Sequence, residues 1–326
     1  MNLSALPIIL HVGPPKTGTT TLQHHCFPNL ANLCFVGKPW FHPHLPYDIC
    51  VGLHKAIDAI SLHPEGRYDA TATRAGCAAY FAALEGYLDQ THGPGHFARS
   101  RFVLSEERLC HEDTVSIEVL AQRLAAVFPA AEVAYVKRDP IPALISGYIW
   151  LYTRAWVDGD VRAWVHDGLA GKPGSTAAIM LHYYDYPRTE AAFARHFNTV
   201  RHANLPDLRA NPDRFFADLL GPGADGRLPE FTADIHSLAA AGANASRNRI
   251  ICELHRSLKK AIRLWNRLPL QKIDEKPEYI GEGGLWPLIE PPLSHLRWGQ
   301  TKFTLTPEDQ KAITAYYTEK PRHDGS

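Results

Sequence analysis

The stretch Leu6–Leu22, LPIILHVGPPKTGTTTL, indicates the fold of the whole chain. Its apolar run Leu6–Val12 has the length of a strand and is bounded by glycine and proline. Gly13–Thr21 follows, and its last residues can begin a helix that continues through Leu22. A strand, a tight glycine-containing loop and a helix start form a geometry that holds phosphate, because loop N–H groups and the helix dipole attract an anion.

The loop departs from the nucleoside-triphosphate pattern G-x-x-x-x-G-K-[ST] in one respect. Gly13 and Gly18 have the spacing of its two glycines, and Thr20 stands in the [ST] place. The lysine place holds Thr19, whereas Lys16 lies three residues earlier, inside the loop. No aspartate follows closely to help a hydroxyl hold Mg²⁺. The pattern therefore favours a phosphate-like group, such as a sulfate ester, whose charge a lysine can neutralise without a metal.

The run His11–Gln23, HVGPPKTGTTTLQ, resembles the 5′-phosphosulfate loop of sulfotransferases that use 3′-phosphoadenosine 5′-phosphosulfate (PAPS), in its bacterial form. The resemblance implies that PAPS is the donor and that no metal is required. It also implies that the donor contacts Pro15, Lys16, Thr17, Gly18, Thr19, Thr20 and Thr21. The alternative is an ordinary strand–turn–helix with an incidental lysine.

The composition is that of a globular protein. The 326 residues can bury a substantial core, and 34 basic residues balance 34 acidic ones, so no polyelectrolyte partner such as nucleic acid is implied. No apolar run reaches the ~18 residues of a membrane span. We interpret the N-terminal apolar run as mature structure, because its removal as a signal peptide would destroy the loop.

The six cysteines are scattered without a C-x-x-C pair, which indicates reduced thiols in a cytoplasmic protein. The 18 histidines give no convincing metal site. His92 and His96 have i, i+4 spacing, but the intervening Gly-Pro-Gly cannot form a regular helix.

Four further strand candidates follow the first: Leu33–Gly37, Arg101–Ser105, Ala131–Lys137 and Asn198–Ala203. They alternate with helical stretches, which is typical of α/β proteins. We expect a three-layer, P-loop-like fold with a central, mainly parallel sheet flanked by helices. The expected organisation is one domain over 1–326, in which 41–100 and 245–300 shape or cap the acceptor site.

Helix starts are indicated by capping residues and spacing. Asp113 or Thr114 can cap a helix that runs to about Phe128, Asp139 a helix that begins at Pro140, and Asn211 a helix that ends near Gly221. Thr71–Gln90 has helical spacing, with one face made of Cys77, Phe81, Leu84 and Leu88.

Charged residues follow three of the predicted strands. Lys16 comes after the first, Glu106 and Glu107 after the third, and Arg138 after the fourth. In an open α/β sheet, ligands bind beyond the carboxyl ends of the strands. If the sheet is parallel, these residues meet at one edge and form an active site.

Arg138 and Ser146 are similar to the 3′-phosphate site of the same family, in which an arginine ends a strand and a serine follows on the next helix. A guanidinium and a hydroxyl can both donate to phosphate oxygens. PAPS carries a 3′-phosphate and ATP does not. The alternative is an arginine that merely precedes a capped helix.

Leu104–Leu109, LSEERL, is similar to an S-x-E-x-L stretch of bacterial members, and in that register Glu107 is the matching acid, with Glu106 beside it. Either carboxylate could take the proton of an acceptor hydroxyl as general base. The alternative is an acid at a helix start or in a salt bridge. His42 and His44 are further candidates for the base, by similarity to cytosolic small-molecule sulfotransferases, which have a histidine as the base.

Ser246–Leu268 has a helical apolar face: Ile250, Ile251, Leu254, Leu258, Ile262 and Trp265. The rest is basic: Arg247, Arg249, Arg256, Lys259, Lys260, Arg263 and Arg267. It could bind an anionic acceptor or a membrane surface, and the alternative is a surface helix with a solvated basic face.

The sequence thus predicts a cytoplasmic, PAPS-dependent sulfotransferase that acts on an acceptor hydroxyl. The family resemblance favours a saccharide or glycolipid acceptor. A metal-dependent P-loop kinase or nucleotidase and a non-catalytic nucleotide-binding module are the alternatives. The identity of the acceptor, the choice of base and the oligomeric state stay open.

Overall fold

The structure is a computed structural model of the chain and describes residues 1–37, 44–112, 114–223, 226–241, 249–267 and 303–319. The chain divides into two compact units. The first comprises Met1–Arg138 and His182–Ala243, and the second comprises Asp139–Leu181 and Asn244–Ser326. A single domain over 1–326 stays a prediction, because it concerns how the two units associate.

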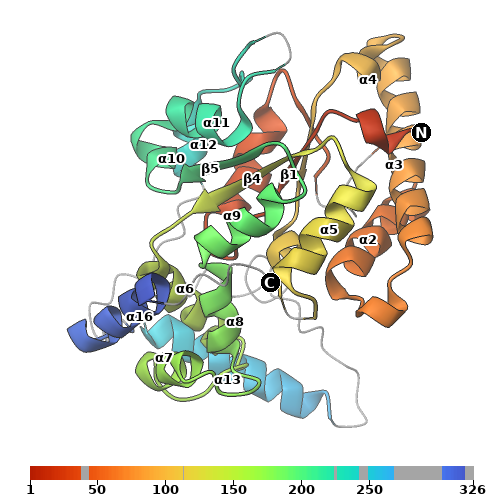
Figure 1. Cartoon of the computed structure of the whole chain (residues 1–326). Coiled ribbons are helices and arrows are strands. Elements are labelled where there is room, and N and C mark those ends of the chain that lie inside the picture. Colours follow the sequence, from red (N-terminus) through yellow and green to blue (C-terminus); the bar gives the residue numbers. More distant parts are fainter. Residues whose placement is uncertain (38–43, 113, 224–225, 242–248, 268–302, 320–326) are drawn as a thin grey trace. The chain divides into compact units, whose positions relative to one another are not determined.

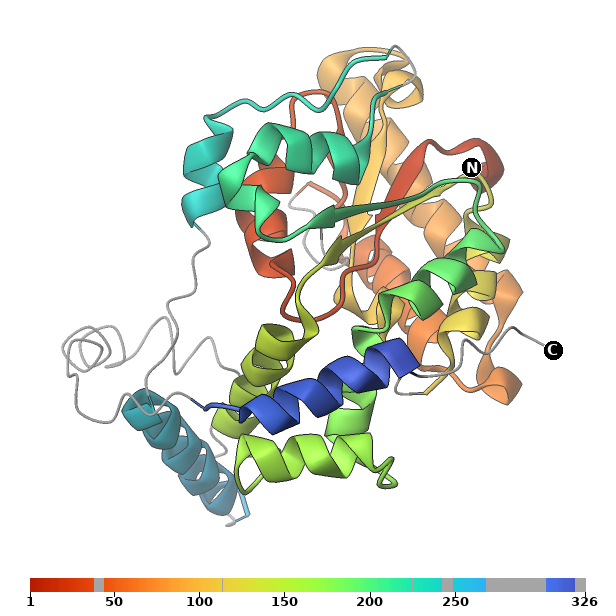
Figure 2. The same cartoon turned by 60° about the vertical axis from the view of Figure 1, so that its left-hand side comes forward.

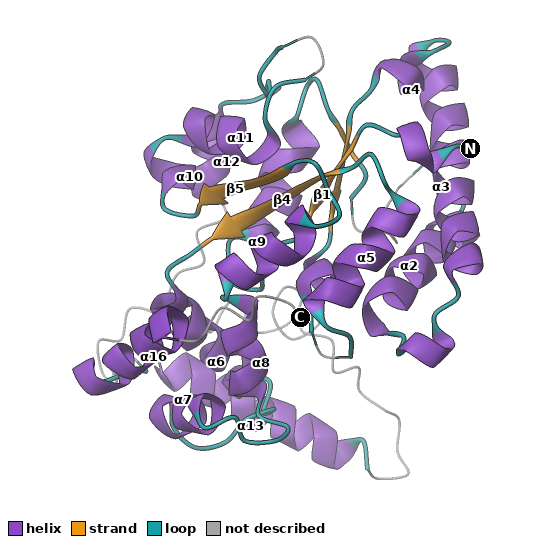
Figure 3. Cartoon of the chain, viewed as in Figure 1, coloured by secondary structure: helices purple, strands orange, loops and turns teal. Residues whose placement is uncertain are grey.

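A parallel sheet of five strands forms the centre of the first unit (Figure 3). The strands are β1 (Ile8–His11), β2 (Cys34–Phe35), β3 (Phe102–Ser105), β4 (Glu132–Lys137) and β5 (Val200–Asn204). They lie in the order β2-β3-β1-β4-β5, and each neighbouring pair is parallel. All five predicted strands are confirmed, and β1, which carries the loop, lies in the middle of the sheet.

The strands are apolar because helices cover both faces of the sheet. One face packs against η2 (Leu22–Cys26), α10 (Asp207–Ala210), α11 (Pro212–Leu220) and α12 (Ile235–Ala241), as Figure 1 shows. This core joins Ile9 and Val103 of the sheet to Phe215 and Phe216 of α11. The predicted three-layer arrangement is therefore confirmed on this side by a continuous buried cluster.

The opposite face packs against α3 (Ala70–His92), α5 (Ile117–Val127) and α9 (Tyr186–Ala194) (Figure 1). The Phe81 ring of α3 lies edge-on to Phe102 of β3, with 5.8 Å between the ring centroids. Tyr135 of β4 stacks on Tyr186 of α9. Helix α2 (Tyr47–Leu62) packs on α3 as a further layer.

Shorter helical turns complete the first unit: η1 (Leu3–Ala5), α1 (Thr19–Thr21), η3 (Phe27–Asn29), η4 (Glu65–Arg67), α4 (His96–Arg99) and η5 (Glu107–Cys110). The predicted helix over 71–90 is confirmed as α3, and its four predicted face residues are all buried. The predicted cap of α5 is wrong: Ser116, whose hydroxyl accepts from the Val119 N–H at 3.3 Å, replaces Thr114, and Asp113 lies outside the described residues.

Helix α2 was not expected from the sequence. Its buried residues Cys50, Leu53, Ile57 and Ile60 recur at three- and four-residue intervals, which is a helical pattern. The capped helix at Asn211 is confirmed as α11, and Gly221 follows it with a φ of +62°.

The second unit is helical in its described part. Its helices are α6 (Pro140–Thr153), α7 (Val161–Leu169), most of α8 (Thr176–Tyr183), α13 (Arg249–Trp265) and α16 (Pro307–Glu319). Asp139 caps α6 as predicted, because its carboxylate accepts from the Ile141 N–H at 2.9 Å. Among the described helices, none combines the length and the apolar character needed to span a bilayer.

A buried carboxylate, Asp309, joins α16 to α7. Its side chain is 2% exposed, and one of its oxygens accepts from Arg162 Nε at 2.8 Å. The other oxygen contacts His166 Nε2 at 2.8 Å. The backbone N–H and the hydroxyl of Thr306 donate to the same oxygen as Arg162, each at 2.9 Å. Figure 2 shows α16 in blue.

The predicted exposure of the basic residues of α13 is confirmed only in part. Lys260 and Arg267 are exposed, but Arg256 and Lys259 are buried, so the expectation of surface cations is wrong at these two positions. Arg256 donates to the Tyr152 carbonyl at 3.0 Å and forms an ion pair with Asp158. Long cationic side chains can bury their stems in this way when their heads find acceptors.

Two members of the predicted apolar face can be compared with the structure: Ile262 is buried and Trp265 is exposed. The side chains of Ile250, Ile251, Leu254 and Leu258 lie outside what the structure describes. Residues 246–248 and 268 of the predicted helix lie outside the described residues.

We expect Asp309→Asn to lower the free energy of unfolding by about 2–4 kcal/mol, since it removes the charge from a buried, multiply bonded carboxylate. Burial alone would raise the pKa of Asp309, but hydrogen bonds from Thr306, His166 and Arg162 outweigh it and hold the pKa well below its ordinary value. A pKa lowered on folding stabilises the protein above the unfolded value of about 3.9, and this stabilisation is lost as the pH falls.

Urea unfolding of the wild-type protein and of Asp309→Asn, between pH 7 and pH 3, measures the difference in their free energies of unfolding. Asp167→Asn is the matched control, because the pair between Asp167 and Lys172 is exposed and should contribute less than about 1 kcal/mol. Equal effects of the two substitutions would contradict the structural role of Asp309.

Candidate active site

The loop Gly13–Gly18 leaves the carboxyl end of β1 and leads into α1, which continues directly as η2. Two of its residues have left-handed backbones. Gly18 has a φ of +86°, and a Cβ at this position would lie 2.6 Å from Leu205 Cδ1. Lys16 has a φ of +67°, a conformation that costs a residue with a side chain roughly 1–3 kcal/mol. The surrounding structure must therefore hold Lys16 in place.

Side chains from other elements hold the loop by its carbonyl groups. Four consecutive carbonyl oxygens of the loop accept a hydrogen bond from a side chain. Cys110 Sγ donates to Gly13 (3.1 Å), Thr17 Oγ1 to Pro14 (2.7 Å), Tyr184 Oη to Pro15 (2.9 Å) and Arg138 Nη1 to Lys16 (2.6 Å).

These bonds determine which way the peptide groups of the loop face. A carbonyl that is held by a donor leaves the N–H of the same peptide plane on the opposite side, so the Pro15 and Lys16 carbonyls direct the N–H groups of Lys16 and Thr17. The planes of the Gly13 and Pro14 carbonyls contain proline nitrogens, which have no N–H. Successive N–H groups on one side of a turn form a concavity that binds anions. The loop therefore has the arrangement of an anion cradle, with Lys16 as its lysine and the start of α1 at its end.

Arg138 lies next to this loop, as the sequence predicts. Tyr186 Oη accepts from the Arg138 N–H and donates to the Arg138 carbonyl, both at 2.9 Å. These two bonds fix the backbone at the end of β4. One guanidinium nitrogen of Arg138 donates to the carbonyl oxygen of Lys16. A guanidinium has five N–H donors, so further donors are present for a phosphate. Ser146, its predicted companion, is half-buried on α6 in the second unit, and its role stays a prediction.

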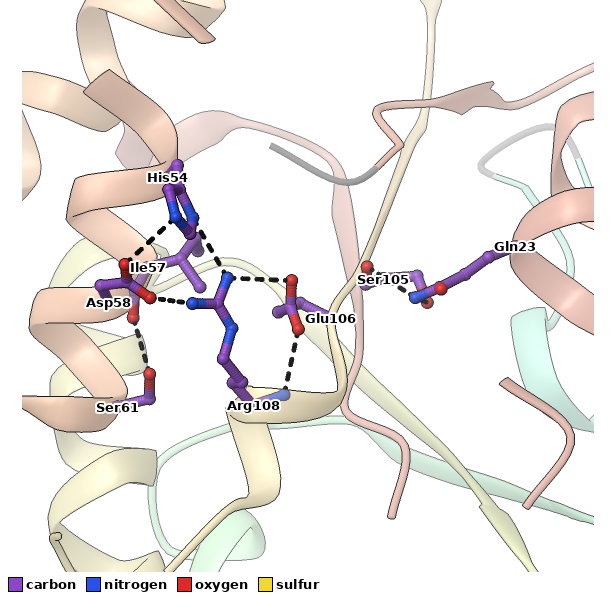
Figure 4. Close-up of polar contacts among 8 residues, drawn as sticks. All are labelled: Gln23, His54, Ile57, Asp58, Ser61, Ser105, Glu106 and Arg108. Carbon is purple, nitrogen blue, oxygen red and sulfur yellow. Dashed lines mark hydrogen bonds and ion pairs between the residues drawn. The ribbon is translucent and has the colours of Figure 1, made fainter. Parts of the chain in front are cut away.

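The two candidate acids at the end of β3 differ in their surroundings. Glu106 is 3% exposed, and its carboxylate accepts from the backbone N–H and from a guanidinium nitrogen of Arg108, each at 3.2 Å. Arg108 in turn pairs with Asp58 of α2 and contacts His54 at 3.2 Å (Figure 4). Glu106 is therefore the buried member of an ion-pair network whose other members, Arg108 and Asp58, are partly exposed.

Glu107 is half-buried, and its charge acts on Tyr184. Burial raises the pKa of Tyr184 well above its ordinary value, Arg138 opposes this rise, and the negative charge of Glu107 adds to it. The hydroxyl of Tyr184 is the group that donates to the Pro15 carbonyl. The charges of Glu107 and Arg138 therefore act on the same point of the loop.

A polar chain that the sequence did not predict runs beneath the loop. His11 ends β1, is fully buried, and pairs with Ser105 across the sheet. Its Nδ1 lies 2.7 Å from Ser105 Oγ, and Gln23 Nε2 donates to the same hydroxyl oxygen at 3.0 Å (Figure 4 shows Gln23 and Ser105). Burial lowers the pKa of His11 to about 3. A histidine within an apolar strand was the one indication of it in the sequence.

The other predicted residues are placed as follows. Thr17, Thr19 and Thr21 are buried, Pro15 is half-buried and Thr20 is exposed. Among the loop histidines, His42 lies outside the described residues, and His44 stacks on the Tyr87 ring with 4.9 Å between centroids. Within the described part of the chain, no three His, Cys, Asp or Glu side chains gather as metal ligands would.

We expect Glu106→Gln to lower the free energy of unfolding by about 2–4 kcal/mol, because it leaves the Arg108 guanidinium with a neutral partner at a buried position. Glu107→Gln should change it by less than about 1 kcal/mol, since this residue is half-buried. Urea unfolding at pH 7 measures both. A larger loss for Glu107→Gln than for Glu106→Gln would contradict the assignment of Glu106 to the structural network.

Comparisons with known proteins found no match among family models or curated proteins. The chain is similar to a solved sulfotransferase from Alicyclobacillus acidocaldarius, with 14% identity and a TM-score of 0.44 over 81% of this chain and 100% of that one. It is also similar to the sulfotransferase domain from the curacin biosynthetic pathway, with 16% identity and a TM-score of 0.35 over 84% of this chain and 95% of that one. At these values neither match decides the function, which must be argued from the loop and its partners.

Proposed function

We propose that this chain is a PAPS-dependent sulfotransferase, which moves a sulfuryl group from PAPS to an acceptor hydroxyl. The observation that carries the proposal is the bond from the Arg138 guanidinium to the carbonyl of Lys16. It joins the residue predicted for the 3′-phosphate to the residue predicted for the phosphosulfate. A donor that carries both groups on one ribose fits this pair.

The loop favours this donor over Mg²⁺-bound ATP. In P-loop enzymes a lysine at the helix start reaches the β- and γ-phosphates, and a metal neutralises the remaining charge. Here that place is taken by Thr19, which is buried, and the lysine lies within the left-handed turn of the loop instead. A sulfuryl group carries less charge than a γ-phosphoryl group, so one lysine and the loop N–H groups can serve it.

The proposed reaction is an in-line displacement at sulfur. The acceptor oxygen forms a bond to sulfur while the bond between sulfur and the bridging oxygen of the 5′-phosphate breaks. The electron pair of that bond leaves with adenosine 3′,5′-bisphosphate, and Lys16 neutralises the charge that develops on the bridging oxygen. The N–H groups of Thr17 to Thr20 hold the phosphosulfate, and Pro15 and Thr21 border it.

Glu107 is the general base of this proposal, and takes the proton of the acceptor hydroxyl. It is preferred to Glu106 because it is the matching acid in the register of the family resemblance and because it is half-buried, whereas Glu106 is 3% exposed. His44 is the remaining described alternative. Arg138 holds the 3′-phosphate through its other guanidinium donors, and Ser146 is its proposed second contact.

The remaining parts of the proposal come from the family resemblance, the cysteine spacing and the residue pattern of 246–268. They are a saccharide or glycolipid as acceptor, a location in the cytoplasm, and contact of 246–268 with a membrane surface. The segments 41–100 and 245–300 are proposed to shape the acceptor site.

We expect Lys16→Ala to lower turnover at least about 100-fold, since it removes a positive charge next to the developing negative charge. The fold should persist, because the loop is held by its carbonyl groups. Release of adenosine 3′,5′-bisphosphate from PAPS, with a panel of saccharide, glycolipid, phenol and amine acceptors, measures it. Lys172→Ala, at an exposed pair, is the control and should leave turnover unchanged. Unchanged turnover in Lys16→Ala would contradict the role of Lys16.

Calorimetric titration tests the donor directly. We expect adenosine 3′,5′-bisphosphate to bind without Mg²⁺, and at least about 10-fold more tightly than Mg·ATP, because a charged hydrogen-bonded contact contributes about 1.5–3 kcal/mol. Arg138→Ala should remove most of this preference, whereas Arg195→Ala, at the exposed end of α9, should keep it.

Two results would favour the alternatives. Preference for Mg·ATP would favour a P-loop kinase or nucleotidase. Tight binding of the bisphosphate without transfer to any acceptor in the panel would favour a non-catalytic nucleotide-binding module.

A further inference from the structure

The chain of polar groups beneath the loop has a defined direction. Gln23 Nε2 lies 3.1 Å from the Ser105 carbonyl oxygen, which can only accept, so the amide nitrogen is the group on that side. It must therefore also donate to Ser105 Oγ, at 3.0 Å. The serine hydroxyl has one proton, and the ring nitrogen 2.7 Å away, His11 Nδ1, is the partner that can receive it.

The direction of this chain determines the tautomer of His11. Burial lowers the pKa of His11 to about 3, so the ring is neutral at pH 7. Because Nδ1 accepts from Ser105, the one proton of a neutral ring lies on Nε2. Phe27, edge-on to the imidazole at 5.3 Å between centroids, keeps the ring in this orientation. His11 therefore presents a fixed N–H donor on the side of the ring that faces away from Ser105.

That donor faces a space that the loop borders. His11 Nε2 is buried and has no partner in the described structure, and the same holds for Thr19 Oγ1. Both line the same side of Gly13: a Cβ at residue 13 would lie 2.7 Å from Thr19 Oγ1 and 3.5 Å from His11 Nε2. A buried polar atom without a partner costs roughly 1–3 kcal/mol, so two of them at one place indicate a missing partner.

We propose that His11 is a positioning residue for the 5′-phosphate of the donor, and acts through Thr19. When the nucleotide binds, His11 Nε2–H donates to Thr19 Oγ1, and the Thr19 hydroxyl donates its own proton to an oxygen of the 5′-phosphate. Gln23, Ser105, His11 and Thr19 then form one chain in which every group donates toward the ligand. This role rests on the proposed function, because it assumes that the loop holds the 5′-phosphate.

The chain adds a donor without adding a charge beneath the loop. A cation at this position would bind the product, adenosine 3′,5′-bisphosphate, as tightly as it binds PAPS. A neutral hydrogen-bond chain of fixed direction instead selects for an acceptor oxygen at one place. Gly13 keeps this space open, because a Cβ there would lie 2.7 Å from Thr19 Oγ1 and 3.5 Å from His11 Nε2.

The test compares two nucleotides by calorimetric titration: adenosine 3′,5′-bisphosphate and adenosine 3′-monophosphate, which lacks the 5′-phosphate. The wild-type protein should prefer the bisphosphate. His11→Leu should lower affinity for the bisphosphate about 10- to 100-fold, which is the range for a lost hydrogen bond on a charged group. Affinity for the monophosphate should stay unchanged. His11→Gln, whose amide N–H can replace Nε2–H, should recover most of the loss, and His24→Leu, at an exposed residue, is the matched control.

Nuclear magnetic resonance of the wild-type imidazole nitrogens tests the same inference without a substitution in the buried chain. The His11 ring should be the Nε2–H tautomer at pH 7, and the bisphosphate but not the monophosphate should shift the Nε2 proton. Ser105→Ala should allow the other tautomer. An Nδ1–H tautomer in the wild-type protein would overturn the proposal.

The titrations also distinguish failure of the proposed function from failure of the role of His11. Equal binding of both nucleotides by the wild-type protein would overturn the proposed function, and the role of His11 with it. A wild-type preference that survives in His11→Leu would overturn the role of His11 alone.

Discussion

The site depends on the hydrogen bonds that hold four consecutive carbonyl groups of the loop, those of residues 13–16, because the last two of them determine the direction of the Lys16 and Thr17 N–H groups. A peptide plane can turn its N–H toward a ligand only if its oxygen finds a donor elsewhere. One donor lies within the loop, at Thr17, and the others are Cys110, Arg138 and Tyr184. Cys110 follows β3 and Arg138 follows β4, so the parallel order β3-β1-β4 brings these two residues to opposite sides of the loop. The left-handed backbone of Lys16 is sustained by the same contacts, so fold and site share one set of bonds.

Much of the frame could be predicted from the sequence. Parallel strands that are covered on both faces are largely apolar, so β1, β3 and β4 stood out from their surroundings, whereas the edge strand β5, with the sequence VRHAN, gave a weaker signal. The position of Lys16 and Arg138 at strand ends was enough to bring them together, because parallel strands end at one edge. The partners of the loop could not be predicted in this way. Tyr184 is 169 residues from the carbonyl it binds, and no local pattern distinguishes it from other buried tyrosines.

Helical periodicity was a weaker guide wherever charged residues are buried. Glu106 and Arg256 both belong to segments in which charge is usually solvated, yet both are buried with a partner of opposite charge, Arg108 and Asp158. Asp58 and His54 of the distant helix α2 contact Arg108, and the carbonyl groups of Tyr152 and Val157 accept from Arg256. Such burial is possible because the charged groups have partners of opposite charge or carbonyl acceptors, and those partners depend on tertiary structure. The cap of α5 shows the same limit on a smaller scale, since three polar residues precede the helix and packing selects Ser116.

The bond between Arg138 and the Lys16 carbonyl has a thermodynamic consequence. Two binding events that share one rigid group cannot have independent free energies, and the coupling acts equally in both directions. If the guanidinium is oriented by one end of a nucleotide, the lysine turn at the other end is oriented with it, and an ordered turn in return improves the guanidinium site. In a protein that uses the nucleotide as proposed, discrimination between nucleotides is then cooperative. A molecule that lacks one anionic group also loses part of the binding free energy that the other anionic group contributes.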